Sequence, residues 1–343
     1  MDAVEGAAVG AAREAMDRAY GPWTGPQWAP AHFSRAHSHK GRYLWTDAFG
    51  VCNYCSLYLE TGDNRYLRQA ETLAAAVHNT LGFTRNGASR LGNATDDHPT
   101  RGGLRIGKPN ESGPDCDGQY LHYLNKWCFA LLQATADEGR YLVWALELAD
   151  ATFDRFMCLE APGGARRLAW KMTIDLSRPL VSSSGMLDAL DSLVTFQLLE
   201  AAAGRALGDE RGGAPRLDGQ IVVAAALVAH WWRGFKSDDP LDLGEALWLA
   251  HWFASGDAGH PHTHTHTHAA APECGGGGVL RGRGPGRELD LDLSSACDHV
   301  AARALEGLEG LWGEGYFSQP LSRRLGFREL GATLGVQVAK PSL

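Results

Sequence analysis

The sequence predicts an all-α fold, an (α/α) toroid of five to six helical hairpins with long loops at one rim. Strand-like alternation is weak along the 343 residues. Two segments, 61–77 and 137–153, repeat one outer-helix pattern in which Tyr66 aligns with Tyr141. Acidic residues also recur at the start of alternate apolar helices. Repeated helical hairpins are typical of closed or stacked all-α arrays.

Apolar residues at helical spacing predict the elements in chain order. The N-terminal helix covers 2–19. Four helix pairs follow, at 43–60 with 64–80, 117–135 with 139–156, 186–203 with 215–233, and 240–255 with 294–310. Pro320 precedes a last helix at 321–334, which we expect to pair with the first one and close the ring.

Long loops separate the hairpins, at 81–114, 157–184 and 256–293. Ordered loops of this length are usually functional, so we expect the first two to cover a cavity rim. The third is rich in Gly and of low complexity, which predicts a disordered insertion at about 257–289. We otherwise expect a single domain over residues 1–343.

The third loop also carries a tract in which histidine alternates with Thr and Pro. Such a tract can bind a transition metal, but it lacks fixed ligand geometry, so we assign it no metal site. Its histidines are His260, His262, His264, His266 and His268.

Composition limits the kinds of partner. Apolar residues make up 44% and charged residues 21%, and the net charge is −8 without a dense Lys/Arg stripe, which argues against nucleic-acid binding. No apolar run reaches the roughly 20 residues that span a bilayer, and the N-terminus lacks a secretory pattern. The seven scattered cysteines predict reduced thiols. We expect a soluble cytoplasmic protein that binds neither nucleic acid nor membrane.

Acids at the helix starts are the strongest chemical signal. If alternate helices form the inner ring, their first turns meet at one rim and the carboxylates converge on one cavity. Two carboxylates in such a cleft raise one pKa, which supplies the acid and base of glycosidic hydrolysis. Helix capping is the simpler explanation for any single acid. The predicted catalytic residues are Asp117, Asp47, Asp188 and Asp191.

Charged and aromatic residues near the same helix starts predict substrate binding. Loop charges suit a polar or anionic ligand, although they can simply face solvent. Aromatic faces stack on sugar rings, although large rings are also ordinary core residues. The predicted binding residues are Asp97, His98, Arg101, Arg105, Lys108, Asp115, Tyr120, His122, Trp45 and Glu245.

Nucleotide-binding glycine loops, HExxH and GxSxG are absent from the sequence, so we assign no cofactor and no metal. The turn and helix TGDNRYLRQAETLA, the helix start WTDAFG and the acidic rim together resemble the six-hairpin, or (α/α)-barrel, sugar-active enzymes. That group includes glycoside hydrolases, unsaturated-uronide hydrolases and N-acylglucosamine 2-epimerase-like isomerases. The resemblance covers most of 40–255 and implies a small polar or sugar-like substrate.

Three hypotheses follow. The first is a glycoside hydrolase that uses paired rim carboxylates. The second is a sugar epimerase or isomerase in which a rim histidine, His98, His122 or His251, moves a proton. The third is a non-catalytic α/α scaffold that binds a protein partner.

Overall fold

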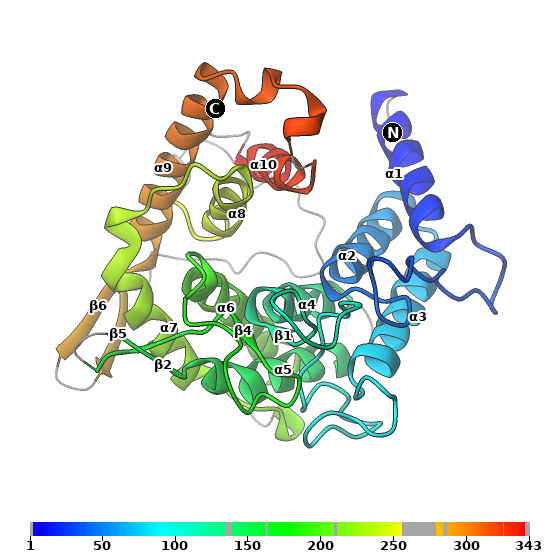
Figure 1. The fold of residues 1–343 in the computed structure, drawn as a ribbon, viewed down its shortest axis with the longest axis horizontal. Coiled ribbons are helices and arrows are strands. Elements are labelled where there is room, and N and C mark those ends of the chain that lie inside the picture. The colour runs from blue at the N-terminus through cyan, green and yellow to red at the C-terminus, as the bar shows by residue number, and fades with distance from the viewer. Residues whose placement is uncertain are drawn as a thin grey trace. The chain divides into compact units, whose positions relative to one another are not determined.

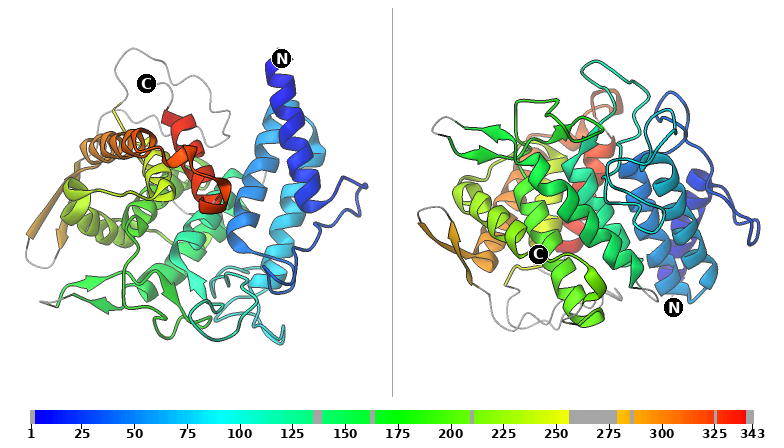
Figure 2. Two further views of the ribbon diagram at one scale, coloured as in Figure 1. Left: turned by 45° about the horizontal axis from the view of Figure 1, so that its top comes forward. Right: turned by 90° about the horizontal axis from the view of Figure 1, so that it is seen from below.

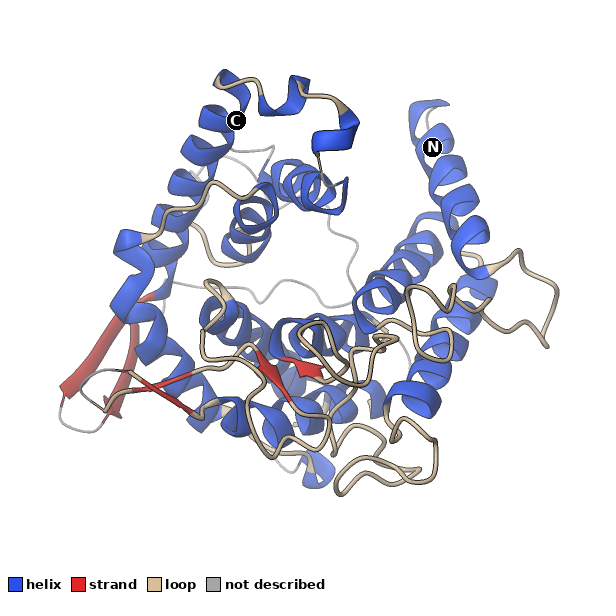
Figure 3. Cartoon of the chain, viewed as in Figure 1, coloured by secondary structure: helices blue, strands red, loops and turns tan. Residues whose placement is uncertain are grey.

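The computed structural model describes residues 3–134, 139–161, 164–208, 211–255, 279–284, 287–324 and 326–339. Within these ranges the chain is mainly helical with short strands, which confirms the all-α class (Figure 3).

Two compact units divide the chain. The first comprises Met1–Ser184 and Thr195–Leu217, and the second Gly185–Val194 with the described residues from Asp218 onward. The long helix α6 (Asp188–Ala206) therefore contributes its first turns to the second unit and the remainder to the first. A single domain was expected, and ring closure between the first and last helices stays a prediction.

Five further helices build the first unit (Figure 1). They are α1 (Ala3–Tyr20), α2 (Leu44–Thr61), α3 (Asn64–Leu81), α4 (Leu121–Gln133) and α5 (Arg140–Phe156). Helices α1, α2 and α3 lie side by side (Figure 2), α4 packs on α5, and α2 also packs on α4. The two hairpins predicted from 43–60 with 64–80 and from 117–135 with 139–156 are therefore confirmed.

The turn between α2 and α3 follows from its sequence. Gly62 has φ 68°, a left-handed conformation that glycine adopts without strain, and it ends α2. Asp63 then caps α3 by accepting the backbone N–H of Arg65. The aligned residues Tyr66 and Tyr141 are both buried, so the repeat seen in the sequence marks equivalent packing positions.

The start of α4 differs from the prediction. Residues Gln119–Tyr120 form strand β1, which pairs antiparallel with β4 (Lys171–Met172), so that Tyr120 lies opposite Lys171. The helix begins only at Leu121, and the expected place of Asp117 in its first turn is wrong. The cause is local, because Asp117 binds loop backbone instead of helix backbone. A second short pair joins β2 (Leu159–Glu160) to β3 (Arg166–Arg167).

Helices α7 (Asp218–Trp231), α8 (Pro240–Ala250), α9 (Leu293–Gly313) and α10 (Gly326–Ala339) belong to the second unit. Helix α8 packs on α9, which confirms the pair predicted from 240–255 with 294–310. It also packs closely on α10, where a Cβ added at Gly244 would lie 2.0 Å from the carbonyl oxygen of Gly331. Glycine therefore sets the distance between these helices.

Two strands lie at the end of the predicted insertion. Strands β5 (Val279–Gly284) and β6 (Arg287–Asp292) form an antiparallel hairpin, and the disorder expected at about 257–289 stays a prediction. The histidine tract lies outside the described residues. None of the described helices combines the length and apolar character needed to cross a membrane.

Candidate functional site

Asp117 lies at the centre of a buried ion network. Its side chain is fully buried, and one oxygen, Oδ2, accepts hydrogen bonds from Arg105 (2.6 Å) and Arg85 (2.8 Å). The other oxygen, Oδ1, accepts backbone N–H groups, those of Gly107, Lys108 and Gly118. Five donors occupy both oxygens. A general acid or base must reach the substrate, so this geometry favours an anchoring role for Asp117 and Arg105 over the predicted ones.

Asp47 is held in a similar way at the start of α2. Its carboxylate is fully buried, lies 3.3 Å from Arg42 Nη1 and accepts the backbone N–H of Tyr43 at 3.0 Å. Burial raises the pKa of Asp47 to about 7, while the positive charge of Arg42 opposes the shift. The side chain closes the first helical turn, as the capping explanation predicted, and joins it to the preceding segment.

Three predicted binding residues brace the first long loop against α5. His98 Nδ1 and Arg101 Nη2 each lie 2.7 Å from the same oxygen of buried Glu147. The backbone carbonyl of Asp97 accepts a hydrogen bond from the indole of Trp144 at 2.8 Å. These contacts fix the loop. Glu147 was not predicted as a partner because it lies among apolar residues of α5.

Aromatic rings gather where α2 and α4 begin. We call this cluster the aromatic face; its members are Tyr43, Trp45, Tyr120, His122, Tyr123 and Trp170. Centroid distances are 4.5 Å for Tyr120 and Tyr123, and 5.1 Å for Tyr120 and Trp170. All members except buried His122 are half-buried, so their rings keep exposed surface. Such surface suits stacking on a sugar ring.

The aromatic face unites three predicted residues, Trp45, Tyr120 and His122. Sequence reasoning missed Tyr123 and Trp170. The signals were present, since Tyr123 follows Tyr120 by three residues and Trp170 directly precedes the strand that pairs with Tyr120.

One lysine, Lys171, adjoins the aromatic face, and a second, Lys108, lies near it in the preceding loop. Lys108 pairs with the exposed carboxylate of Asp115, as the prediction of a shared polar loop implied. Lys171 is 2% exposed, and its ammonium donates to the carbonyl oxygen of Cys116 at 2.6 Å. The ammonium also lies 6.0 Å from the ring centroid of Trp170. Burial lowers the pKa of Lys171, and the charge of Lys108 lowers it further.

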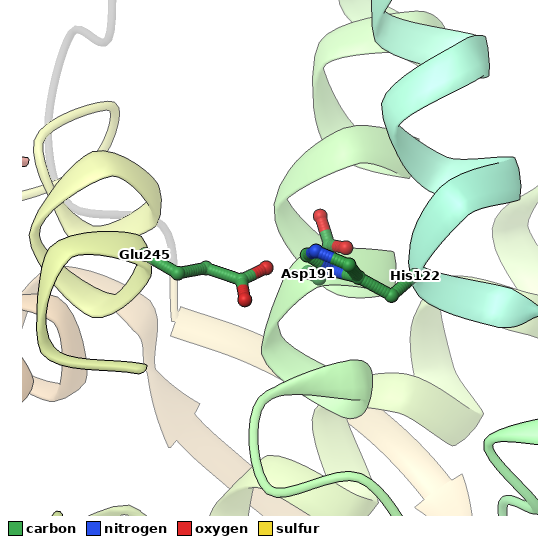
Figure 4. A group of neighbouring side chains, drawn as sticks. All are labelled: His122, Asp191 and Glu245. Carbon is green, nitrogen blue, oxygen red and sulfur yellow. The ribbon is translucent and has the colours of Figure 1, made fainter. Parts of the chain in front are cut away.

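In the second unit, acidic side chains lie close to one another. Asp188 and Asp191 lie in the first turn of α6 as predicted, and both are buried. Glu245 is half-buried and extends from α8 toward Asp191 (Figure 4). One carboxylate oxygen of Asp191 lies within 4.8 Å of one of Glu245. His122, the third side chain in that figure, belongs to the first unit.

This acid pair has two chemical uses. Carboxylates at such a distance can act as acid and base on one substrate, or provide oxygen ligands for a hard cation such as Mg²⁺ or Ca²⁺. Farther along α8, burial lowers the pKa of His251 to about 4, and its Nδ1 bonds the carbonyl of Trp248. His251 is therefore neutral at pH 7.

Comparison with known proteins adds no relative. No family model, curated protein or solved structure matches this chain. The fold and these clusters define a mainly helical protein with a candidate acid pair, and its function has to be argued from the residues themselves.

Proposed function

We propose that this chain is a carbohydrate-active enzyme that hydrolyses a glycosidic bond with Asp191 and Glu245 as its catalytic pair. The observation that supports it is that one oxygen of each acid lies within 4.8 Å of an oxygen of the other. Retaining glycosidases place their carboxyl groups about 5–5.5 Å apart, whereas inverting ones need roughly 6.5–9.5 Å to admit a water molecule. So close an approach fits the retaining spacing better than the inverting one.

The two acids differ in exposure, which assigns their roles. Asp191 is fully buried, whereas Glu245 is half-buried and is the more accessible of the two acids. In the proposed mechanism Asp191 protonates the leaving oxygen while Glu245 attacks the anomeric carbon and forms a glycosyl ester. Asp191 then deprotonates the water that cleaves this ester, so the free sugar leaves and both acids return to their starting states.

The first unit, taken by itself, is also suited to a carbohydrate ligand. The aromatic face offers half-buried rings of the kind that stack on sugars. Asp47 and Asp117 are not part of the proposed catalytic pair, because each forms an ion pair with a buried arginine. The proposal keeps the toroid of hairpins, the architecture in which the helix starts would meet at one rim.

A panel of aryl glycosides and free sugars tests the proposal. We expect Asp191→Asn and Glu245→Gln to lower kcat/KM by about 10²–10⁴-fold, the usual contribution of a positioned acid or base. Asp298→Asn is the matched control, because this acid of the same unit bonds Ser255. Full activity in both variants, or a product of inverted configuration, would refute the assignment. Incorporation of solvent deuterium at carbon, without hydrolysis, would identify an isomerase instead.

A further inference from the structure

Lys171 is a buried cation whose bonding is incomplete. An ammonium group carries three N–H donors. Among the described residues, the carbonyl of Cys116 is the single hydrogen-bond acceptor of Lys171. The aliphatic stem packs against Gly118, where an added Cβ would lie 2.5 Å from the carbonyl oxygen of Met172 and 3.5 Å from Lys171 Cε. The chain therefore approaches this lysine closely but leaves two of its donors unused.

Negative charge around Lys171 is limited. The adjacent residues Asp115 and Cys116 bind the two ammonium groups, Asp115 that of Lys108 and the Cys116 carbonyl that of Lys171. Burial lowers the pKa of Lys171, and the nearby charge of Lys108 lowers it further. Asp115 and Asp117 act in the opposite direction, but both oxygens of Asp117 already bind arginine or backbone N–H groups. The negative charge of Asp115 then has to neutralise the positive charges of both lysines. A buried charge without a matching counter-ion is costly, so this place favours an added anion.

Asp115 indicates which anion fits. Its carboxylate pairs with Lys108, yet its side chain is 71% exposed and can turn into solvent. A carboxylate or phosphate group from a ligand could then take the same place beside Lys108. Exposed ion pairs contribute little to stability, so the exchange costs little.

Lys171 is joined to the aromatic face by the backbone. Lys171 pairs with Tyr120 in the β1–β4 ladder, and its ammonium lies 6.0 Å from the ring centroid of Trp170. The negative charge of Asp115 also reaches Tyr123, where it adds to the effect of burial and raises the pKa of the phenol. A ligand ring on the aromatic face would therefore have these charges at its edge.

We propose that Lys108 and Lys171 form an anion subsite at the edge of the aromatic face, which takes the carboxylate or phosphate group of a charged sugar. Asp115 holds Lys108 until the ligand displaces it. Sugar acids and sugar phosphates share this chemistry. The expectation that the ligand is a sugar rests on the proposed function. The anion subsite itself is tested by binding and does not require turnover.

Calorimetric titration of the full chain provides the test, with glucuronate, glucose 6-phosphate, glucose and inorganic phosphate as probes. We expect one charged sugar to bind at least about tenfold more tightly than glucose, and the better of the two identifies the anion source. Lys171→Met and Lys108→Met should each weaken that binding by about 10- to 100-fold, the effect of one charge-assisted hydrogen bond. Asp115→Asn should tighten it, because the competing carboxylate is lost.

Lys236→Met serves as the control, because this exposed lysine lies in the second unit and should leave binding unchanged. Far-UV circular dichroism checks that each variant is folded. If Lys171→Met does not fold, the half-buried Lys108 still tests the subsite. Equal binding of charged and neutral sugars, or charged-sugar binding that survives in folded lysine variants, would overturn the inference. The Asp191→Asn variant distinguishes the two proposals. If the proposed function is correct, this variant loses hydrolysis but still binds the charged sugar normally.

Discussion

Acids in the two units have opposite surroundings. In the first unit, Asp47 faces Arg42, and Asp117 faces Arg85 and Arg105. In the second, Asp191 faces another acid, Glu245. An acid near the start of an apolar helix was the common signal in the sequence. The role of each acid therefore depends on its partner: an arginine makes the carboxylate an anchor, while a second carboxylate provides an acid and a base for one substrate.

The largest expected effect is on the first unit. Asp117→Asn should lower the free energy of unfolding by about 3–5 kcal/mol, because it leaves the fully buried Arg105 without its counter-charge. Denaturant unfolding followed by circular dichroism measures the change. Asp97→Asn is the control, since that exposed residue contributes its backbone carbonyl to Trp144 and should change stability by less than about 0.5 kcal/mol. A loss below about 1 kcal/mol for Asp117→Asn would contradict the anchoring role.

The sequence predicted the helical class and several hairpins because their information is local. The spacing of apolar residues indicated helices α2 to α5. The turn between α2 and α3 depends on two adjacent residues, Gly62 and Asp63. Strands β1 and β4 have two residues each, too few for an alternating pattern to show. The prediction therefore began α4 too early and placed Asp117 inside it.

Partners of the candidate site residues could not be predicted for a different reason. Arg85 lies 32 residues before Asp117, and Arg101 lies 46 residues before Glu147. Ion pairs over such distances depend on how loops fold back, which helical periodicity does not encode. The grouping of Trp45 with Tyr120 was anticipated because both stand at predicted helix starts. Asp191 and Glu245 were each predicted, but their pairing was not.

A buried base extends the comparison beyond acids. His78 accepts a hydrogen bond from the indole of Trp127 at 3.0 Å, and burial lowers its pKa to about 3, with a further decrease from the charge of Arg90. The unfolded chain takes up this proton near pH 6.5, before the folded chain does. Stability should therefore be retained above about pH 6.5 and fall with acidification, by up to about 1.4 kcal/mol per pH unit.

Replacing His78 by Gln, which keeps an acceptor but does not titrate, tests this effect. Between pH 6.5 and pH 4.5 the wild type should lose about 2 kcal/mol more unfolding free energy than His78→Gln. Denaturant unfolding at several pH values gives both slopes. Parallel slopes would show that His78 is protonated in the folded protein, and the first unit would then contain an unbalanced buried charge.

The smallest expected effect concerns the second unit and has the opposite sign. Glu245→Gln keeps the shape of the side chain but removes a half-buried negative charge next to Asp191, so it should raise the free energy of unfolding by about 0.5–1 kcal/mol. Asp242→Asn on the same helix is the contrast, because Asp242 accepts a hydrogen bond from Ser237 at 3.0 Å and its substitution should lower stability by about 1 kcal/mol. Thermal unfolding of both variants gives the comparison. If Glu245→Gln were instead as destabilising as Asp117→Asn, Glu245 would be an anchored carboxylate like those of the first unit. The distinction between the two kinds of acid, and the catalytic pair that rests on it, would then have to be abandoned.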